Sequence, residues 1–190
     1  MSEETSLPLA GKTIVLGISG SIAAYKAADM ARLLMKAGAS VHAVMTSGAE
    51  KFITPLTLKS LTQNPVSGNL WENHPGWEPP HIALADSADA LLVAPASANL
   101  LARFAHGLAD DELTALHLAF TGPLLLAPAM NGKMWKHPAT RHNVNILQER
   151  GAHFIGPDQK GMLACGYEGE GRLLPIESIL TQTIEILNAT

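Results

Sequence analysis

Three residues combine a reactive or strongly polar group with an unusual sequence context. His81 follows two prolines and opens the apolar-alternating segment HIAL, and histidine is the side chain best suited to proton transfer near neutral pH. Cys165 lies in the glycine-rich stretch MLACGYEGEGR, which predicts a flap that can carry a thiol into and out of a site. Asn131 follows an apolar run in LAPAMNGKMW, and its amide can bind a carboxylate or the edge of a flat ligand.

Each of these residues also has a purely structural explanation. His81 could be an ordinary surface histidine, Cys165 a small buried residue, and Asn131 the cap of a helix that follows it. Three large apolar side chains lie close to Asn131 in the sequence: Met130, Met134 and Trp135. They could fill the core or form the wall of a site for a flat aromatic ligand, and the sequence leaves both explanations open.

Turns rich in glycine, serine and threonine suit the binding of a phosphate group. GISGSIAAYK at 17–26 joins an apolar run to a helical pattern, and backbone N–H groups at a helix N-terminus bind phosphate well. The stretch is neither a GxGxxG dinucleotide fingerprint nor a P-loop, so it favours a mononucleotide. A plain strand–helix turn is the alternative. Ser97, in PASAN at 95–99, is expected to be a helix N-cap, which is compatible with ligand binding.

Apolar runs and helical periodicity alternate along the chain. Strands are expected at 13–19, 41–46, 90–94, 123–127 and 153–156. Helices are expected at 21–36, 49–62 with a break at Pro55, 99–120 around Gly107, 139–150 and 176–188, with a loop at 70–80. This order predicts an α/β fold with a doubly wound parallel sheet in a single domain over 1–190. Ligands of such sheets lie beyond the carboxyl ends of the strands, where the polar turns fall.

The composition limits the classes of function. The net charge of -4 and the absence of a basic run argue against nucleic-acid binding. The apolar runs are too short to span a bilayer, and the acidic N-terminus is unlike a signal peptide. A single cysteine excludes an internal disulfide and an all-cysteine metal site. We therefore expect a soluble cytoplasmic protein without a metal.

Taken together, these stretches resemble the homo-oligomeric flavin-containing cysteine decarboxylases, and among them the branch that acts in coenzyme A synthesis. The matching residues are 20–26, 81–82, 94–99, 128–135, 163–166, 169 and 171–172. They extend over about residues 12–175, nearly the whole chain. The PxMNxxMW pattern with an ACG stretch downstream is specific, whereas the glycine turn alone would not be.

The resemblance implies FMN as the cofactor, with its phosphate near the polar turns and its ring near Phe52 and Ala129. The implied FMN contacts are Gly20, Ser21, Ile22, Thr46, Ser47, Phe52, Ser97, Ala98, Asn99, Leu100 and Ala129. The implied catalytic residues are His81 and Cys165, and the implied substrate contacts are Met130, Asn131 and Ala164. The resemblance also implies a trimer or dodecamer with FMN and substrate at subunit contacts, which fits a chain that is 47% hydrophobic.

The implied reaction is the decarboxylation of 4′-phospho-N-pantothenoylcysteine to 4′-phosphopantetheine. An N-acylated cysteine has no electron sink β to its carboxylate. In this family, FMN provides one by oxidising the CH2–SH group to a thioaldehyde, and CO2 leaves as an enethiol forms. Reduction, with a proton from Cys165, then gives the saturated thiol. Asn131 would hold the carboxylate, and the apolar residues around it would form a dry wall.

Three relatives of similar fold provide alternatives. Decarboxylases of a peptide C-terminal cysteine release the enethiol, so they do not need the flap cysteine, and Cys165 therefore favours the coenzyme A branch. A flavin prenyltransferase is disfavoured by PAMNGKMW, and a non-catalytic FMN-binding regulator by the lack of an acidic tail.

Many bacterial members of the family are fused to a C-terminal ligase. Because this chain ends at Thr190, we expect a stand-alone decarboxylase or an excised domain.

Overall fold

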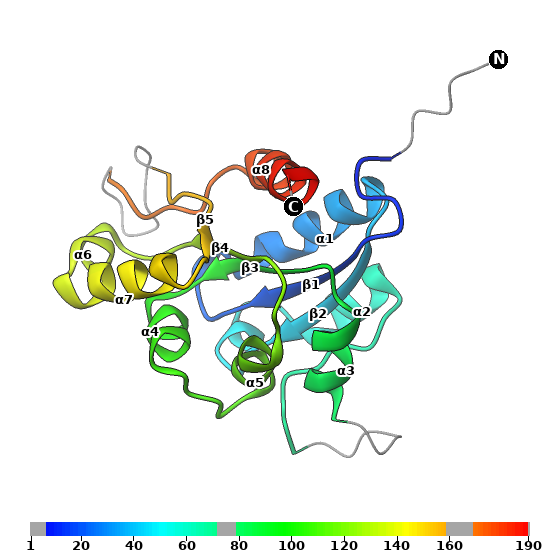
Figure 1. Ribbon diagram of the computed structural model, residues 1–190, viewed down its shortest axis with the longest axis horizontal. Helices are drawn as coiled ribbons and strands as arrows, with labels where there is room; N and C mark the ends of the chain where they lie inside the picture. Colours follow the sequence, from blue (N-terminus) through cyan, green and yellow to red (C-terminus); the bar gives the residue numbers. More distant parts are fainter. Residues whose placement is uncertain (1–6, 72–78, 159–168, 190) are drawn as a thin grey trace.

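A five-stranded parallel sheet forms the centre of the protein (Figure 1). The computed structural model describes residues 7–71, 79–158 and 169–189. The strand order is β2-β1-β3-β4-β5, and every neighbouring pair is parallel. The strands are β1 (Thr13–Ile18), β2 (Ser40–Met45), β3 (Ala90–Ala96), β4 (Leu124–Pro128) and β5 (His153–Phe154). The predicted α/β fold is confirmed, and this order reverses direction at β1 and β3, where such sheets bind ligands.

Helices cover both faces of the sheet. The helical elements are η1 (Ile22–Lys26), α1 (Ala27–Lys36), η2 (Ala49–Lys51), α2 (Pro55–Thr62), α3 (Pro80–Ser87), α4 (Ala98–His106), α5 (Glu112–Ala119), α6 (Gly132–Lys136), α7 (Pro138–Glu149) and α8 (Ile176–Ala189). One apolar cluster packs α1, α2 and α8 on the sheet, and a second packs α4, α5 and α7 on the opposite face. Because both faces are buried, the strands are apolar at nearly every position.

The structure differs from the sequence expectations at three places. The helix expected at 21–36 begins as the 3-10 turn η1, and the helix expected at 99–120 is two helices, because Gly107 ends α4 with a φ of 66°. The segment that begins at His81, which was not assigned to a helix from the sequence, is part of the helix α3. Pro79 and Pro80 occupy the N-cap and first helical positions, where a missing N–H costs nothing. Among the described residues, no helix is both long and apolar enough to cross a membrane.

Candidate functional site

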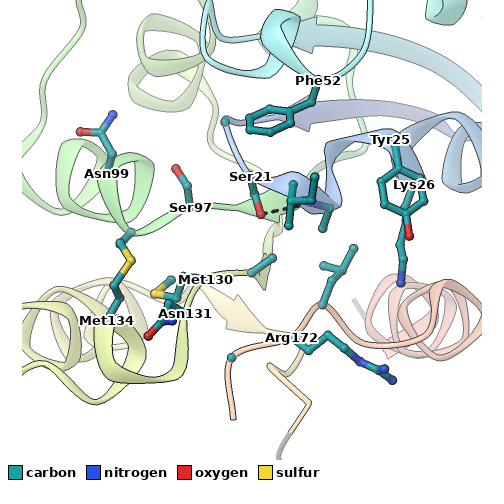
Figure 2. A pocket seen from close by; sticks show the side chains of 17 residues that line it. Ser21, Tyr25, Lys26, Phe52, Ser97, Asn99, Met130, Asn131, Met134 and Arg172 are labelled. Carbon is teal, nitrogen blue, oxygen red and sulfur yellow. Dashed lines mark hydrogen bonds between the residues drawn. The ribbon is translucent and has the colours of Figure 1, made fainter. Parts of the chain in front are cut away.

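A cavity of about 620 Å³ lies beyond the carboxyl ends of β1, β3 and β4 (Figure 2). Its volume falls in the range of roughly 300–1,000 Å³ that is typical of small-molecule sites. The lining residues are Gly20, Ser21, Ile22, Ala23, Tyr25, Lys26, Phe52, Ser97, Ala98, Asn99, Ala129, Met130, Asn131, Met134, Gly171, Arg172 and Leu173. They include ten of the residues expected in the site, so residues from three strand ends meet as the sheet topology predicts.

The turn after β1 depends on a glycine that leaves no room for a side chain. A Cβ on Gly20 would lie 3.1 Å from the backbone of Gly48, so the turns after β1 and β2 pack against each other. Ser21 then caps η1, because its Oγ accepts a hydrogen bond from the N–H of Ala23 at 3.3 Å. This close packing places the start of η1 at the edge of the cavity.

The turn after β3 is tied to the turn after β1 by one buried hydroxyl. The Oγ of Ser19 donates to the carbonyl of Pro95 at 2.7 Å and accepts from the N–H of Ser97 at 2.8 Å. Ser97 in turn caps α4, because its Oγ accepts from the N–H of Leu100 at 3.3 Å. The cap interpretation of Ser97 is confirmed. Ser97 also lines the cavity, so two helical starts border it and a negatively charged group is favoured there.

Apolar side chains form the walls of the cavity. Phe52 lies on one side, and Met130 and Met134 lie on the other (Figure 2). Phe52 is 45% exposed and Met134 is 50% exposed, whereas Trp135 is 8% exposed and belongs to the core. The two explanations of the apolar residues around Asn131 therefore apply to different side chains: Met134 borders the cavity, and Trp135 packs inside.

Asn131 caps a helix and also borders the cavity, and its role in ligand binding stays a prediction. Its Oδ1 accepts a hydrogen bond from the N–H of Lys133 at 2.9 Å, which makes it the N-cap of α6. Its side chain also borders the cavity, beside Met130 (Figure 2).

The backbone N–H of Met130 donates a hydrogen bond to the carbonyl of Gly171 at 2.8 Å. Gly171 has a φ of 113°, and a Cβ there would lie 2.5 Å from the Met130 carbonyl, so only glycine allows residues 171–173 to reach the cavity.

Several lining residues were not among those predicted from the sequence. They are Ala23, Tyr25, Lys26, Gly171, Arg172 and Leu173. Lys26 and Arg172 bring positive charge to the cavity, and the Nη2 of Arg172 donates to the Oδ2 of Asp158 at 3.1 Å. The resemblance motif contained Lys26 and Arg172, but no spacing rule distinguishes a lining residue from its neighbours in such a motif.

Other predicted site residues do not line the cavity. Thr46 is 6% exposed, and its Oγ1 accepts from the N–H of Ala49 at 3.3 Å. Leu100 is a core residue, and Ser47 is exposed. Cys165 and Ala164 lie outside the described residues, so their predicted roles stay predictions.

His81 lies in a different part of the chain from Asn131. It is in the first turn of α3, which packs on α5, whereas α6 is on the opposite side of the molecule (Figure 1). Burial lowers the pKa of His81. Its Nδ1 is 3.8 Å from the Oε1 of Glu112, a carboxylate at the start of α5. One copy of the chain therefore does not bring His81 and Asn131 together.

The Flavoprotein family profile matches residues 2–188. This chain belongs to the Flavoprotein family. The flavoprotein is 46% identical over 175 residues to the coenzyme A biosynthesis bifunctional protein CoaBC of Haemophilus influenzae, covering 92% of the chain and 44% of that protein. The chain thus spans less than half of this relative. It is also 46% identical over 178 residues to a probable phosphopantothenoylcysteine decarboxylase of Streptococcus mutans, covering 93% of the chain and 99% of that protein.

Known structures of similar fold include cysteine decarboxylases. The flavoprotein matches a cysteine-to-serine mutant of PPC decarboxylase in complex with pantothenoylaminoethenethiol, with a TM-score of 0.83 and 32% identity over 94% of the chain and 99% of that structure. It matches the FMN-dependent cysteine decarboxylase SpaF with a TM-score of 0.82 and 32% identity over 95% of the chain and 99% of that structure. The fold is therefore shared with a PPC decarboxylase and with an FMN-dependent cysteine decarboxylase.

Proposed function

We propose that this flavoprotein decarboxylates 4′-phospho-N-pantothenoylcysteine to 4′-phosphopantetheine, with FMN as cofactor, in the coenzyme A pathway of the cytoplasm. The observation that carries the proposal is the end of β4, where Met130 and Asn131 join a cavity that also contains two helical starts. A relative of nearly the same length that is named as a probable decarboxylase of this substrate supports it.

The residues that line the cavity suit the chemistry of FMN. The helical starts near Ser21 and Ser97, which both line the cavity, would hold the phosphate through backbone N–H groups. Phe52 and Ala129 would contact the ring. When bound, FMN supplies the two-electron oxidation and reduction that amino-acid side chains lack.

The protein's own residues bind the substrate and exclude water. The amide of Asn131 borders the cavity, where it can donate a hydrogen bond to the substrate carboxylate. Met130 and Met134 shield that carboxylate from solvent, and loss of CO2 is favoured when a carboxylate leaves water for an apolar surrounding. We assign the later proton donation to Cys165 on the basis of the family resemblance alone.

His81 exchanges a proton with the substrate in the cavity of a neighbouring copy. The separation of α3 from α6 within one chain supports this assignment (Figure 1), and so do the apolar residues that line the cavity. Ile22 and Tyr25 line the cavity and are each 57% exposed, which suits a surface that a second subunit covers. The proposed assembly is a trimer or a dodecamer.

Product analysis tests the proposed activity. The FMN-loaded protein is incubated with 4′-phospho-N-pantothenoylcysteine, and the mass of the product is measured by mass spectrometry. We expect loss of CO2 with no net change in oxidation state. Loss of CO2 together with two hydrogens would instead support an oxidative decarboxylase of a peptide C-terminal cysteine. An FMN-loaded protein that leaves the substrate unchanged would contradict the proposal.

A further inference from the structure

A fully buried carboxylate lies beside the proposed catalytic histidine. Glu112 is 0% exposed, although it begins the helix α5 and follows two aspartates. Carboxylates are almost never fully buried unless a partner compensates for the loss of water. The Oε1 of Glu112 is 3.8 Å from the Nδ1 of His81, within ion-pair distance when the ring is protonated. Burial at this position therefore requires a reason, and His81 provides one.

The orientation of the His81 ring fits this pairing. Its Nδ1 is buried and forms no hydrogen bond within the described part of the chain, yet the side chain as a whole is 22% exposed. The exposed part of the ring is therefore not the Nδ1 edge. One nitrogen faces Glu112 inside the protein, and the other edge is available for a substrate. Imidazole rings in enzymes commonly use their two nitrogens in this way, with a carboxylate that fixes the tautomer and favours the imidazolium.

We propose that Glu112 is a positioning residue for His81: its carboxylate keeps the proton of the neutral ring on Nδ1, leaves Nε2 free to accept a proton, and stabilises the imidazolium that then forms. No bond to the substrate is involved, and the proton moves only between His81 and the reacting group. The catalytic part of this inference rests on the proposed function. The coupling between the two side chains does not.

Other charged groups near the two helices have different surroundings. The remaining ionisable side chains of α3 and α5 are Asp86, which is exposed, and His117, which stacks on Phe104 of α4. In the loop before α5, Asp110 and Asp111 both pair with Arg103. Glu112 is thus the carboxylate in ion-pair contact with His81 among the described residues.

The sign of the effect on His81 follows from two opposing causes. Burial of the ring lowers the pKa of His81. An opposite charge within about 4–6 Å raises the pKa of a histidine, so Glu112 opposes the effect of burial. Replacing Glu112 with neutral glutamine leaves burial alone, and the pKa of His81 falls further. Every pH-dependent step that uses this ring then moves to lower pH.

The test is an NMR titration of the FMN-loaded protein with 13C- and 15N-labelled histidine. The chain has eight histidines, and loss of one signal in His81→Asn assigns the resonance of His81. In Glu112→Gln, we expect the pKa of His81 to fall by roughly one pH unit. The limb of the pH profile of kcat/KM that reflects His81 should shift to lower pH by the same amount. Glu112→Asp, which keeps the charge, should retain most of the wild-type pKa.

Asp110→Asn is the matched control. It removes one negative charge two residues away from Glu112, from a side chain that is 70% exposed, and it should leave the pKa of His81 unchanged.

An identical pKa of His81 in wild type and Glu112→Gln would overturn the proposal. If Glu112→Gln does not fold, the nitrogen shifts of the wild-type ring decide instead: an Nδ1–H tautomer is expected, and an Nε2–H tautomer would overturn it. These titrations need no substrate, so they separate this inference from the proposed decarboxylation.

Discussion

At the scale of single residues, Asn131 joins a structural role to a proposed chemical role, and the two can be separated by substitution. The cap needs only an oxygen at Oδ1, which aspartate also provides. The proposed contact with a carboxylate needs a donor, which an ionised aspartate lacks. A change to aspartate therefore retains the first function and removes the second.

We expect Asn131→Asp to keep its stability within a few tenths of a kcal/mol, because Asn and Asp are equivalent caps. Its KM for the substrate should rise about tenfold or more through repulsion between two carboxylates. Asn131→Ala is the converse control and should lose about 1 kcal/mol of the free energy of unfolding. Denaturant unfolding and steady-state kinetics measure these two quantities. An unchanged KM in Asn131→Asp would remove the carboxylate role.

Residues whose role is local could be predicted from the sequence, and residues whose role depends on tertiary packing could not. The caps Ser97 and Asn131 act on N–H groups two or three positions away, so a short window of sequence contains the whole interaction. The pair of His81 and Glu112 is 31 positions apart in the chain numbering and depends on how α3 packs on α5. No periodicity in the sequence indicates that contact.

At the scale of elements, the helices α4 and α5 are joined through an aromatic pair. The rings of Phe104 and His117 stack with a centroid distance of 3.9 Å and an interplanar angle of 8°. Burial, followed by the positive charge of Arg150, lowers the pKa of His117 to about 4. The neutral ring is therefore the form that the packed helices favour.

The stability of the protein should fall as the pH decreases from 6.5 towards 4. A histidine whose pKa is lower in the folded state than in the unfolded state takes up its proton preferentially in the unfolded chain below pH 6.5. A decrease in the pKa of His117 from 6.5 to about 4 on folding lowers the free energy of unfolding by roughly 3 kcal/mol at most at low pH. His117→Phe keeps an aromatic ring on Phe104 without the titration, so its unfolding free energy should fall less over this range. Equal pH slopes for both proteins in urea unfolding would refute this role of His117.

Element types were easier to predict than their ends. The strands were correct to within a few residues because burial on both faces leaves continuous apolar runs. The segment at His81 was assigned to no element from the sequence, although its two prolines favour a helix start. The short helix α6 has too few residues for a periodic pattern, and only its cap indicated it.

At the scale of the whole molecule, we propose that the complete site needs more than one copy of the chain. The sheet topology places Asn131 and the two helical starts in one cavity, and it places His81 elsewhere. The sequence predicted the first grouping through the rule that ligands lie at strand ends. It could not place His81 relative to that cavity, because this rule concerns the ends of the strands and His81 lies at the start of α3. Mixing two defective variants distinguishes a site that is shared between copies from a site within one chain.

Mixed assemblies of two defective chains should recover activity. His81→Asn lacks the proposed proton-transfer group, and Asn131→Asp lacks the proposed carboxylate contact. In a cyclic assembly that contains both, the Asn131→Asp subunit presents an intact His81 to the intact cavity of a His81→Asn neighbour. In a mixed trimer, about one third of the sites are restored in this way. We expect kcat/KM of assemblies that are co-expressed with two tags and purified on both to exceed the sum of the two parents. Activity equal to that sum would place each working site within a single chain and would remove His81 from the cavity of a neighbour.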